Sequence, residues 1–195
     1  MPTPASPPTI SIPAGRILTR IHRAGVDPLW FGDRDRTWRW DAPDGSYGVL
    51  YAGAGAIGSL AETLLRDPEQ RDVFWSDIAK RRLATFEVTR PLVVARLHGQ
   101  GLGWFGVQAG DIVEHFDAST HSSGYDWPQE ISGRVHAMPG LDGIQYRSRF
   151  DNDQLCQAIF ERAGSALARR SRDQPIDRRW AHRVLSERGY TLLDL

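Results

Sequence analysis

The sequence is poor in cysteine, in lysine and in long apolar runs. Cys156 is the only cysteine of the 195 residues, which excludes an intramolecular disulfide and fits a reducing compartment. No stretch approaches the roughly eighteen apolar residues that a membrane-spanning helix needs. Residues 1–15 lack the basic and apolar regions of a signal peptide, and their prolines and small side chains predict a flexible tail. Together these absences predict a cytoplasmic protein with no membrane contact.

The charge balance gives no excess of either sign, since 24 basic residues match 24 acidic ones. A neutral chain is not steered toward nucleic acid or an acidic membrane. The segment WFGDRDRTWRWD at 30–41 interleaves arginine with tryptophan, as platforms for single-stranded nucleic acid do. However, its three aspartates balance its three arginines. We therefore predict a tightly packed, ion-paired loop and no direct contact with nucleic acid.

Metal and nucleotide motifs are absent or incomplete. The six histidines show no His-x-x-x-His spacing, and one cysteine cannot build a structural zinc site, so we predict no metal. A GxGxxG pattern occurs at Gly101, Gly103 and Gly106, but it does not lie between a strand and a helix as a dinucleotide fingerprint should. We predict a loop over 99–110.

Periodicity and turn residues predict one α+β domain with a mixed sheet and flanking helices. No βαβ rhythm points to a doubly wound sheet. The expected elements are bounded by glycine and proline, and apolar residues recur every three to four positions in the helices. Strands are predicted over 16–23, 48–53, 82–89, 92–97, 143–149, 154–161 and 190–195, helices over 56–66, 127–137 and 175–188, and a long ordered loop over 24–47.

Glu62 is the acidic residue with the strongest claim to a function. It lies in the middle of the helix predicted over 56–66, close to the apolar stripe. A carboxylate near a buried face usually has a partner or a role, because an unpaired buried charge is costly. A solvated helix glutamate is the ordinary alternative. Ser148, between Arg147 and Arg149, is by itself an ordinary strand serine.

Four blocks of the sequence together resemble a known family. The blocks LTRIHRAGVDPLWFG, RTWRWDAPDGSYGVLYAG, SLAETLLRD and IQYRSRF resemble the RES domain, which is named for its Arg, Glu and Ser. The resemblance covers residues 16–195, and the residues that match are Arg20, Arg39, Tyr51, Glu62 and Ser148. In two places the chain departs from the family. Asp41 replaces an asparagine that many members have, and Asp151-Asn152-Asp153 replaces a glycine-rich turn.

The resemblance implies a fold like that of the ADP-ribosyltransferases and a toxin that consumes NAD as substrate, with no cofactor. It implies catalytic roles for Glu62, Arg20, Tyr51 and Ser148, and NAD contacts from Arg20, Arg39, Tyr51 and Ser148. A fixed carboxylate at Glu62 would stabilise an oxocarbenium-like ribose. Planar arginines suit the pyrophosphate better than lysines do. Tyr51 is expected to stack on nicotinamide.

The resemblance also implies a partner, a separate antitoxin of the Xre type. Three functions stay open at this point. The first is cleavage of the nicotinamide–ribose bond of NAD with water or phosphate as acceptor. The second is transfer of ADP-ribose to a host protein. The third is a non-catalytic RES-like binding protein, against which the retained signature residues argue. The sequence makes no prediction of the oligomeric state.

Overall fold

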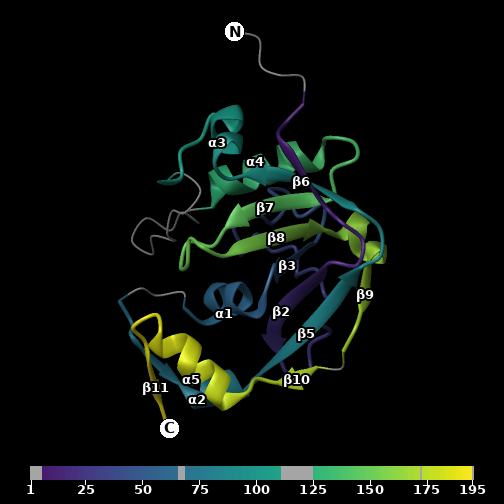
Figure 1. The fold of residues 1–195 in the computed structure, drawn as a ribbon. Helices are drawn as coiled ribbons and strands as arrows, with labels where there is room; N and C mark the ends of the chain where they lie inside the picture. The colour runs from purple at the N-terminus through teal and green to yellow at the C-terminus, as the bar shows by residue number, and fades with distance from the viewer. Residues whose placement is uncertain (1–5, 66–68, 111–124, 172, 195) are drawn as a thin grey trace.

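A curled mixed sheet forms the centre of the molecule (Figure 1). The computed structural model describes residues 6–65, 69–110, 125–171 and 173–194. In this part of the chain nine strands form the main sheet, in the order β1-β6-β7-β8-β3-β2-β5-β10, with β9 also paired to β5. Within this sheet, only the described neighbours β6 and β7 run parallel. The strands are β1 (Thr9–Ile12), β2 (Ile17–Arg23), β3 (Val49–Gly53), β5 (Arg81–Val88), β6 (Leu92–Leu97), β7 (Gly143–Arg147), β8 (Leu155–Phe160), β9 (Leu167–Arg169) and β10 (Gln174–Pro175).

Helices lie at two ends of this sheet, and α1 lies between them beside β2 and β3 (Figure 1). Figure 1 places α3 and α4 beside β6 and β7, and places α2 and α5 at the opposite end with β11. A small parallel pair, β4 with β11, completes the second group. The bounds are α1 (Ala56–Leu64), β4 (Asp72–Phe74), α2 (Trp75–Ala79), α3 (Gln100–Phe105), α4 (Asp126–His136), the 3-10 helix η2 (Glu161–Ala166), α5 (Arg178–Ser186) and β11 (Thr191–Leu193).

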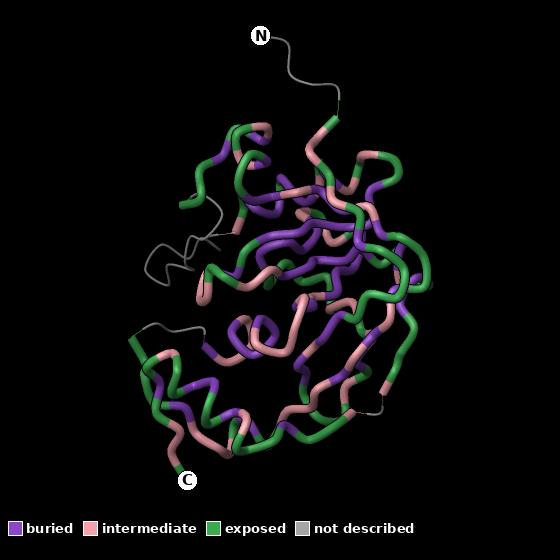
Figure 2. The backbone as a smooth tube through the Cα atoms, viewed as in Figure 1, coloured by how far each residue is buried: buried purple, intermediate pink, exposed green. Residues whose placement is uncertain are grey.

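Buried side chains cover both faces of the sheet. Almost all of β7 and β8 is buried (Figure 2). One face packs Tyr146 and Phe160 against α4 and the fully buried Trp40. The other face encloses Leu18 and Phe86 inside the curl. A third cluster joins α1, α2 and α5. Since the strands pack on both faces, alternation with polar residues is weak in β7 and β8.

The site is located at the point where strands β2 and β3 diverge. Within the described chain these two strands pair only at Thr19 and Gly53. Beyond that point β2 continues along β5 while β3 continues along β8. The Ser59 hydroxyl fixes the junction, because it donates to the Thr19 carbonyl at 2.8 Å and accepts the Gly53 N–H at 3.2 Å. A Cβ at Gly53 would lie 2.5 Å from the Gly55 carbonyl oxygen, so only glycine fits there.

The structure confirms the predicted α+β class and most of the predicted elements. The expected strands over 16–23, 48–53, 82–89, 92–97, 143–149 and 154–161 correspond to β2, β3, β5, β6, β7 and β8. The helices expected over 56–66 and 127–137 correspond to α1 and α4, although Arg66 lies outside the described residues. Residues 24–47 contain no helix or strand, as predicted. No helix among the described residues is long and apolar enough to cross a membrane.

Two predictions of local structure are wrong, and two others have the wrong bounds. Thr9–Ile12, assigned to the flexible tail, forms β1 and pairs with β6. The glycine-rich segment 99–110, expected to be a loop, contains α3, and Gly101 in this helix serves close packing, because a Cβ there would overlap the Arg96 carbonyl oxygen. The helix expected from Pro175 begins at Arg178, with Asp177 as its N-cap, because Pro175 belongs to β10. The strand expected over 190–195 is shorter, since β11 spans Thr191–Leu193.

Candidate active site

A cavity of about 670 Å³ lies where β2 and β3 diverge. Its volume falls in the range of small-molecule sites. The loop over 26–39 forms one wall, and α1 and the end of β7 form others. Because β2 has no partner strand on this side beyond Thr19, four consecutive β2 residues, 20–23, line the cavity. Charged and aromatic lining residues include Arg20, Arg23, Trp30, Trp38, Arg39, Tyr51, Glu62, Arg81, Tyr146 and Arg149.

Glu62 forms a buried polar group with Arg39 and Tyr146 on the cavity wall. Its Oε2 lies 3.3 Å from Arg39 Nη2 and accepts the Tyr146 hydroxyl at 3.4 Å. The Glu62 side chain is 19% exposed and the Arg39 side chain 7%. The Arg39 guanidinium also lies 5.0 Å from the centre of the Tyr146 ring. Burial, and then the charge of Glu62, raise the pKa of Tyr146 well above its ordinary value, so its hydroxyl stays a donor. The carboxylate is therefore oriented by two side chains.

Tyr51 fastens the loop that carries Arg39. Its hydroxyl donates to Asp41 Oδ1 at 2.9 Å and accepts the Trp40 N–H at 2.8 Å. Burial raises the pKa of Tyr51 well above its ordinary value. Burial also raises the pKa of Asp41 to about 6, against the opposing hydrogen bonds from Trp38 and Tyr51. The Tyr51 hydroxyl is thus occupied, and the ring is what remains available for contact with a ligand.

Arg20 supports the opposite part of the same loop. Its Nη1 donates to the carbonyl oxygens of Pro28 at 2.9 Å and Trp30 at 2.6 Å. Burial lowers the pKa of Arg20 to about 10, and nearby Asp27 acts in the opposite direction. The guanidinium therefore stays charged at neutral pH. Arg20 lines the cavity as the sequence predicts, while one of its nitrogens holds the loop.

The structure brings four of the five predicted site residues to the cavity: Arg20, Arg39, Tyr51 and Glu62. Ser148 lies in the turn after β7 and is 1% exposed. Its hydroxyl accepts the Phe150 N–H at 3.2 Å, and its own N–H donates to the Gln154 carbonyl at 3.0 Å. Its neighbours Arg149 and Phe150 line the cavity, whereas Ser148 supports the turn that carries them.

Sequence reasoning missed three important lining residues. Tyr146, which holds Glu62, precedes Ser148 by two positions in the strand pattern, and that spacing was a usable signal. The sequence did not mark Arg23 and Arg81 as site residues, because arginine is abundant in this chain. Their position opposite each other depends on the register of β2 and β5.

The loop over 30–41 is ion-paired, but with other partners than predicted. Arg34 pairs with Glu161 at 2.5 Å and Arg36 with Asp126 at 2.9 Å. Both carboxylates come from distant elements, while Asp35 and Asp41 of the loop accept hydrogen bonds from its own backbone. Asp35, for example, accepts the Thr37 N–H. The tryptophans also divide: Trp40 is fully buried, whereas Trp30 and Trp38 are 39% and 38% exposed.

Among the described residues, no group of three or more His, Cys, Asp or Glu side chains is placed to hold a metal ion. His115 and His121 lie outside the described residues.

Comparisons with known proteins agree with the sequence blocks. A family model described as the RES domain matches residues 17–181, which include every predicted site residue. The chain therefore belongs to the RES-domain family. A search of curated proteins gives no match. Among solved structures, a chain of the M. tuberculosis MbcT–MbcA toxin–antitoxin complex is similar in fold, with a TM-score of 0.58 and 17% identity. The similarity covers 92% of this chain and 91% of that chain.

Proposed function

We propose that this protein is the toxin of a toxin–antitoxin pair and consumes NAD by cleaving the bond between nicotinamide and ribose. The observation that carries the proposal is the Glu62 carboxylate, which Arg39 and Tyr146 hold on the wall of an arginine-lined cavity. RES-family membership supports the same activity. The acceptor is water in hydrolysis or inorganic phosphate in phosphorolysis.

The chemistry requires little beyond charge and position. The C1′–N bond of the nicotinamide riboside unit breaks with its electron pair leaving on nicotinamide, which becomes neutral. Positive charge grows on the ribose, and a fixed carboxylate in a partly dry site stabilises it. An oxygen of water or phosphate then bonds to C1′, and the proton that this oxygen carried is released to solvent. Glu62 is suited to this role, because its orientation is set before the substrate arrives.

The proposal of a partner rests on the family and on the similar structure. The MbcT–MbcA structure contains a toxin and an antitoxin, and one of its chains resembles this chain over almost its whole length. We propose a separate antitoxin protein of the Xre type that inhibits this enzyme. The exposed Trp30 and Trp38 at the cavity offer aromatic surface for such a contact.

Incubation of the purified protein with NAD tests the proposal. We expect release of nicotinamide, measured by liquid chromatography, with ADP-ribose formed in the absence of phosphate or its phosphorylated product in its presence. Glu62→Gln should abolish most of the release. Exposed Glu130→Gln on α4 is the matched control and should retain full activity. No release of nicotinamide under either condition would refute the proposal. Release that depends on an added protein, which becomes labelled, would establish transfer of ADP-ribose instead.

A further inference from the structure

A second group of positive charges lies on the cavity wall, beyond the point where β2 and β3 separate. Arg23 on β2 and Arg81 on β5 are directly opposite each other in the register of the two strands. Both line the cavity. Residues opposite one another in an antiparallel pair have Cβ atoms about 4.5–5.5 Å apart. The two side chains therefore start from one rung of the sheet and border the same space.

This arrangement is unfavourable without a counter-charge. Like charges directly opposite each other destabilise a strand pair. The pKa of Arg81 is lowered, first by burial and then by the charge of Arg23, with Asp77 acting against both. Within the described residues, neither guanidinium forms an ion pair with a carboxylate. The pair thus presents concentrated positive charge to the cavity.

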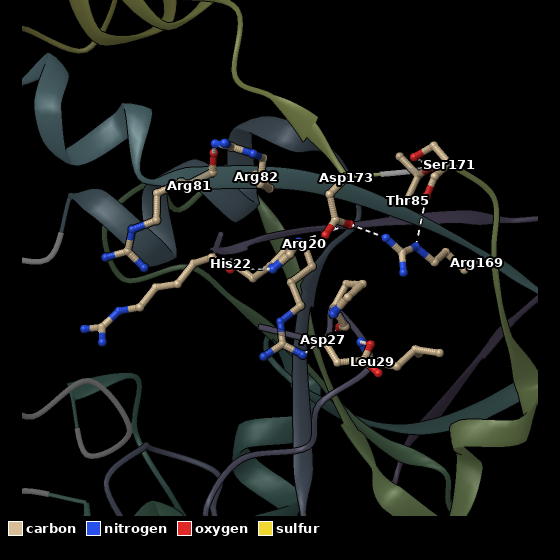
Figure 3. Close-up of polar contacts among 12 residues, drawn as sticks. Arg20, His22, Asp27, Leu29, Arg81, Arg82, Thr85, Arg169, Ser171 and Asp173 are labelled. Atoms are coloured by element: carbon tan, nitrogen blue, oxygen red, sulfur yellow. Dashed lines mark hydrogen bonds and ion pairs between the residues drawn. The ribbon is translucent and has the colours of Figure 1, made fainter. Parts of the chain in front are cut away.

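Carboxylates near this rung are engaged elsewhere. Asp77 pairs with Lys80 at 3.2 Å. Asp173 pairs with Arg169 at 2.7 Å and lies 3.4 Å from the ring of the buried His22. Figure 3 shows that the Arg81 side chain points away from Asp173 and its partners Arg169 and His22. Asp27, Asp33 and Asp35 also line the cavity, but none of them forms an ion pair with Arg23 or Arg81 within the described residues. Asp77 acts on the Arg81 charge without contacting it as an ion pair, so both guanidinium groups can still take an external anion as a direct partner.

The arginines first expected to bind phosphate are already in use. Arg20 Nη1 donates to two loop carbonyls, and Arg39 pairs with Glu62. Arg23 lies three residues beyond Arg20 on β2, a separation of about 10 Å at roughly 3.3 Å per residue. The Arg23–Arg81 rung is therefore a separate position on the cavity wall.

We propose that Arg23 and Arg81 form a phosphoryl-binding subsite of this cavity. Guanidinium groups bind phosphate oxygens through paired hydrogen bonds, and two of them suit a doubly charged group. The ligand is the pyrophosphate of a dinucleotide or an inorganic phosphate ion. Only its assignment to NAD or to the acceptor phosphate rests on the proposed function, because affinity for phosphoryl groups does not require turnover.

Calorimetric titration tests the subsite without any reaction. ADP, adenosine and inorganic phosphate are titrated into the wild type, Arg23→Gln and Arg81→Gln. Arg16→Gln is the matched control, because Arg16 is an exposed arginine just before β2 and does not line the cavity. We expect ADP affinity to fall at least 10-fold in both cavity variants, with adenosine affinity unchanged and the control equal to wild type. If phosphate affinity falls and ADP affinity does not, the subsite holds the inorganic ion. If neither falls, the proposal is wrong.

Thermal unfolding separates ligand binding from a structural role. Removing one of two like charges should leave the apo melting temperature unchanged or higher, while the rise produced by ADP should shrink. A lower apo melting temperature with a full ADP response would assign Arg23 and Arg81 to stability and overturn the subsite. Loss of ADP affinity in a protein that does not cleave NAD would retain the subsite and refute only the proposed reaction.

Discussion

Replacing Glu62 by glutamine removes one charge and almost no volume, so it tests the site most directly. A glutamine oxygen can still accept from Arg39 and Tyr146, which now donate to Glu62 Oε2. The neutral glutamine side chain would no longer stabilise the positive charge that develops on the ribose. Loss of one preorganised electrostatic group typically lowers the rate by about 10²–10³-fold. We expect the nicotinamide release rate to fall by about 100-fold or more, with little change in NAD affinity.

The same substitution should reduce stability, because it leaves the Arg39 charge buried. Hydrogen bonds to charged groups contribute about 1.5–3 kcal/mol. A domain of this size loses about 2–4 °C of melting temperature per kcal/mol, so a decrease of about 3–12 °C is expected. The double variant Arg39→Gln/Glu62→Gln should recover part of this loss, because it removes the buried guanidinium charge together with the carboxylate that opposes it. A folded Glu62→Gln protein within about threefold of wild-type turnover would remove Glu62 from the mechanism.

Three further predictions follow from neighbouring groups. Arg20→Lys should weaken NAD binding by about 2–5 kcal/mol, because an ammonium cannot hold the loop carbonyls and the ligand together; unchanged affinity by calorimetry would place the phosphate contact elsewhere. In the folded protein the pKa of Asp41 is about 6, above its ordinary value of 3.8. The protonated Asp41 side chain therefore contributes to the free energy of unfolding below pH 4, and this contribution is lost as pH rises through 6. The free energy of unfolding of Asp41→Asn should therefore rise by up to about 3 kcal/mol relative to that of the wild type between pH 4 and pH 7, measured by denaturant unfolding. A difference between the two proteins that stays constant with pH would contradict this. Expression in bacteria should arrest growth while NAD falls, and Glu62→Gln should relieve both; arrest with constant NAD would instead favour the transferase.

The elements with strong local patterns could be predicted from the sequence. α1 shows its apolar stripe, and β3 is a short apolar run that ends in Gly53. The position of α1 and β3 against β2 was not predictable, because it depends on Thr19, which lies far along the chain from Gly53 and Ser59. The segment 99–110 shows the opposite failure. Its glycines indicate a loop by propensity, but close backbone contact at Gly101 requires glycine within a helix.

The candidate site was predictable as a set of residues but not as a geometry. The family blocks identified Glu62 and Arg39, yet their ion pair crosses 23 positions and depends on an irregular loop. No periodicity encodes such a contact. The role of Ser148 could not be inferred either, since its burial follows from the turn that returns β7 toward β8.

At the junction between β2 and β3, backbone atoms largely set the opening of the cavity, whereas side chains on its walls set its chemistry. Backbone atoms around Gly53 and the Ser59 hydroxyl fix the opening between the strands, whereas the side chains of Arg20 and Tyr51 hold the loop that forms one wall. The lining residues 20–23 lie on a strand whose other edge is secured to β5 along its whole length. Substitutions of the exposed Arg23, which holds no loop backbone in the described structure, can change what the cavity binds while the fold stays intact. Under selection, a protein built in this way can exchange ligands or escape an inhibitor by point mutation, whereas changes at Gly53 would be removed.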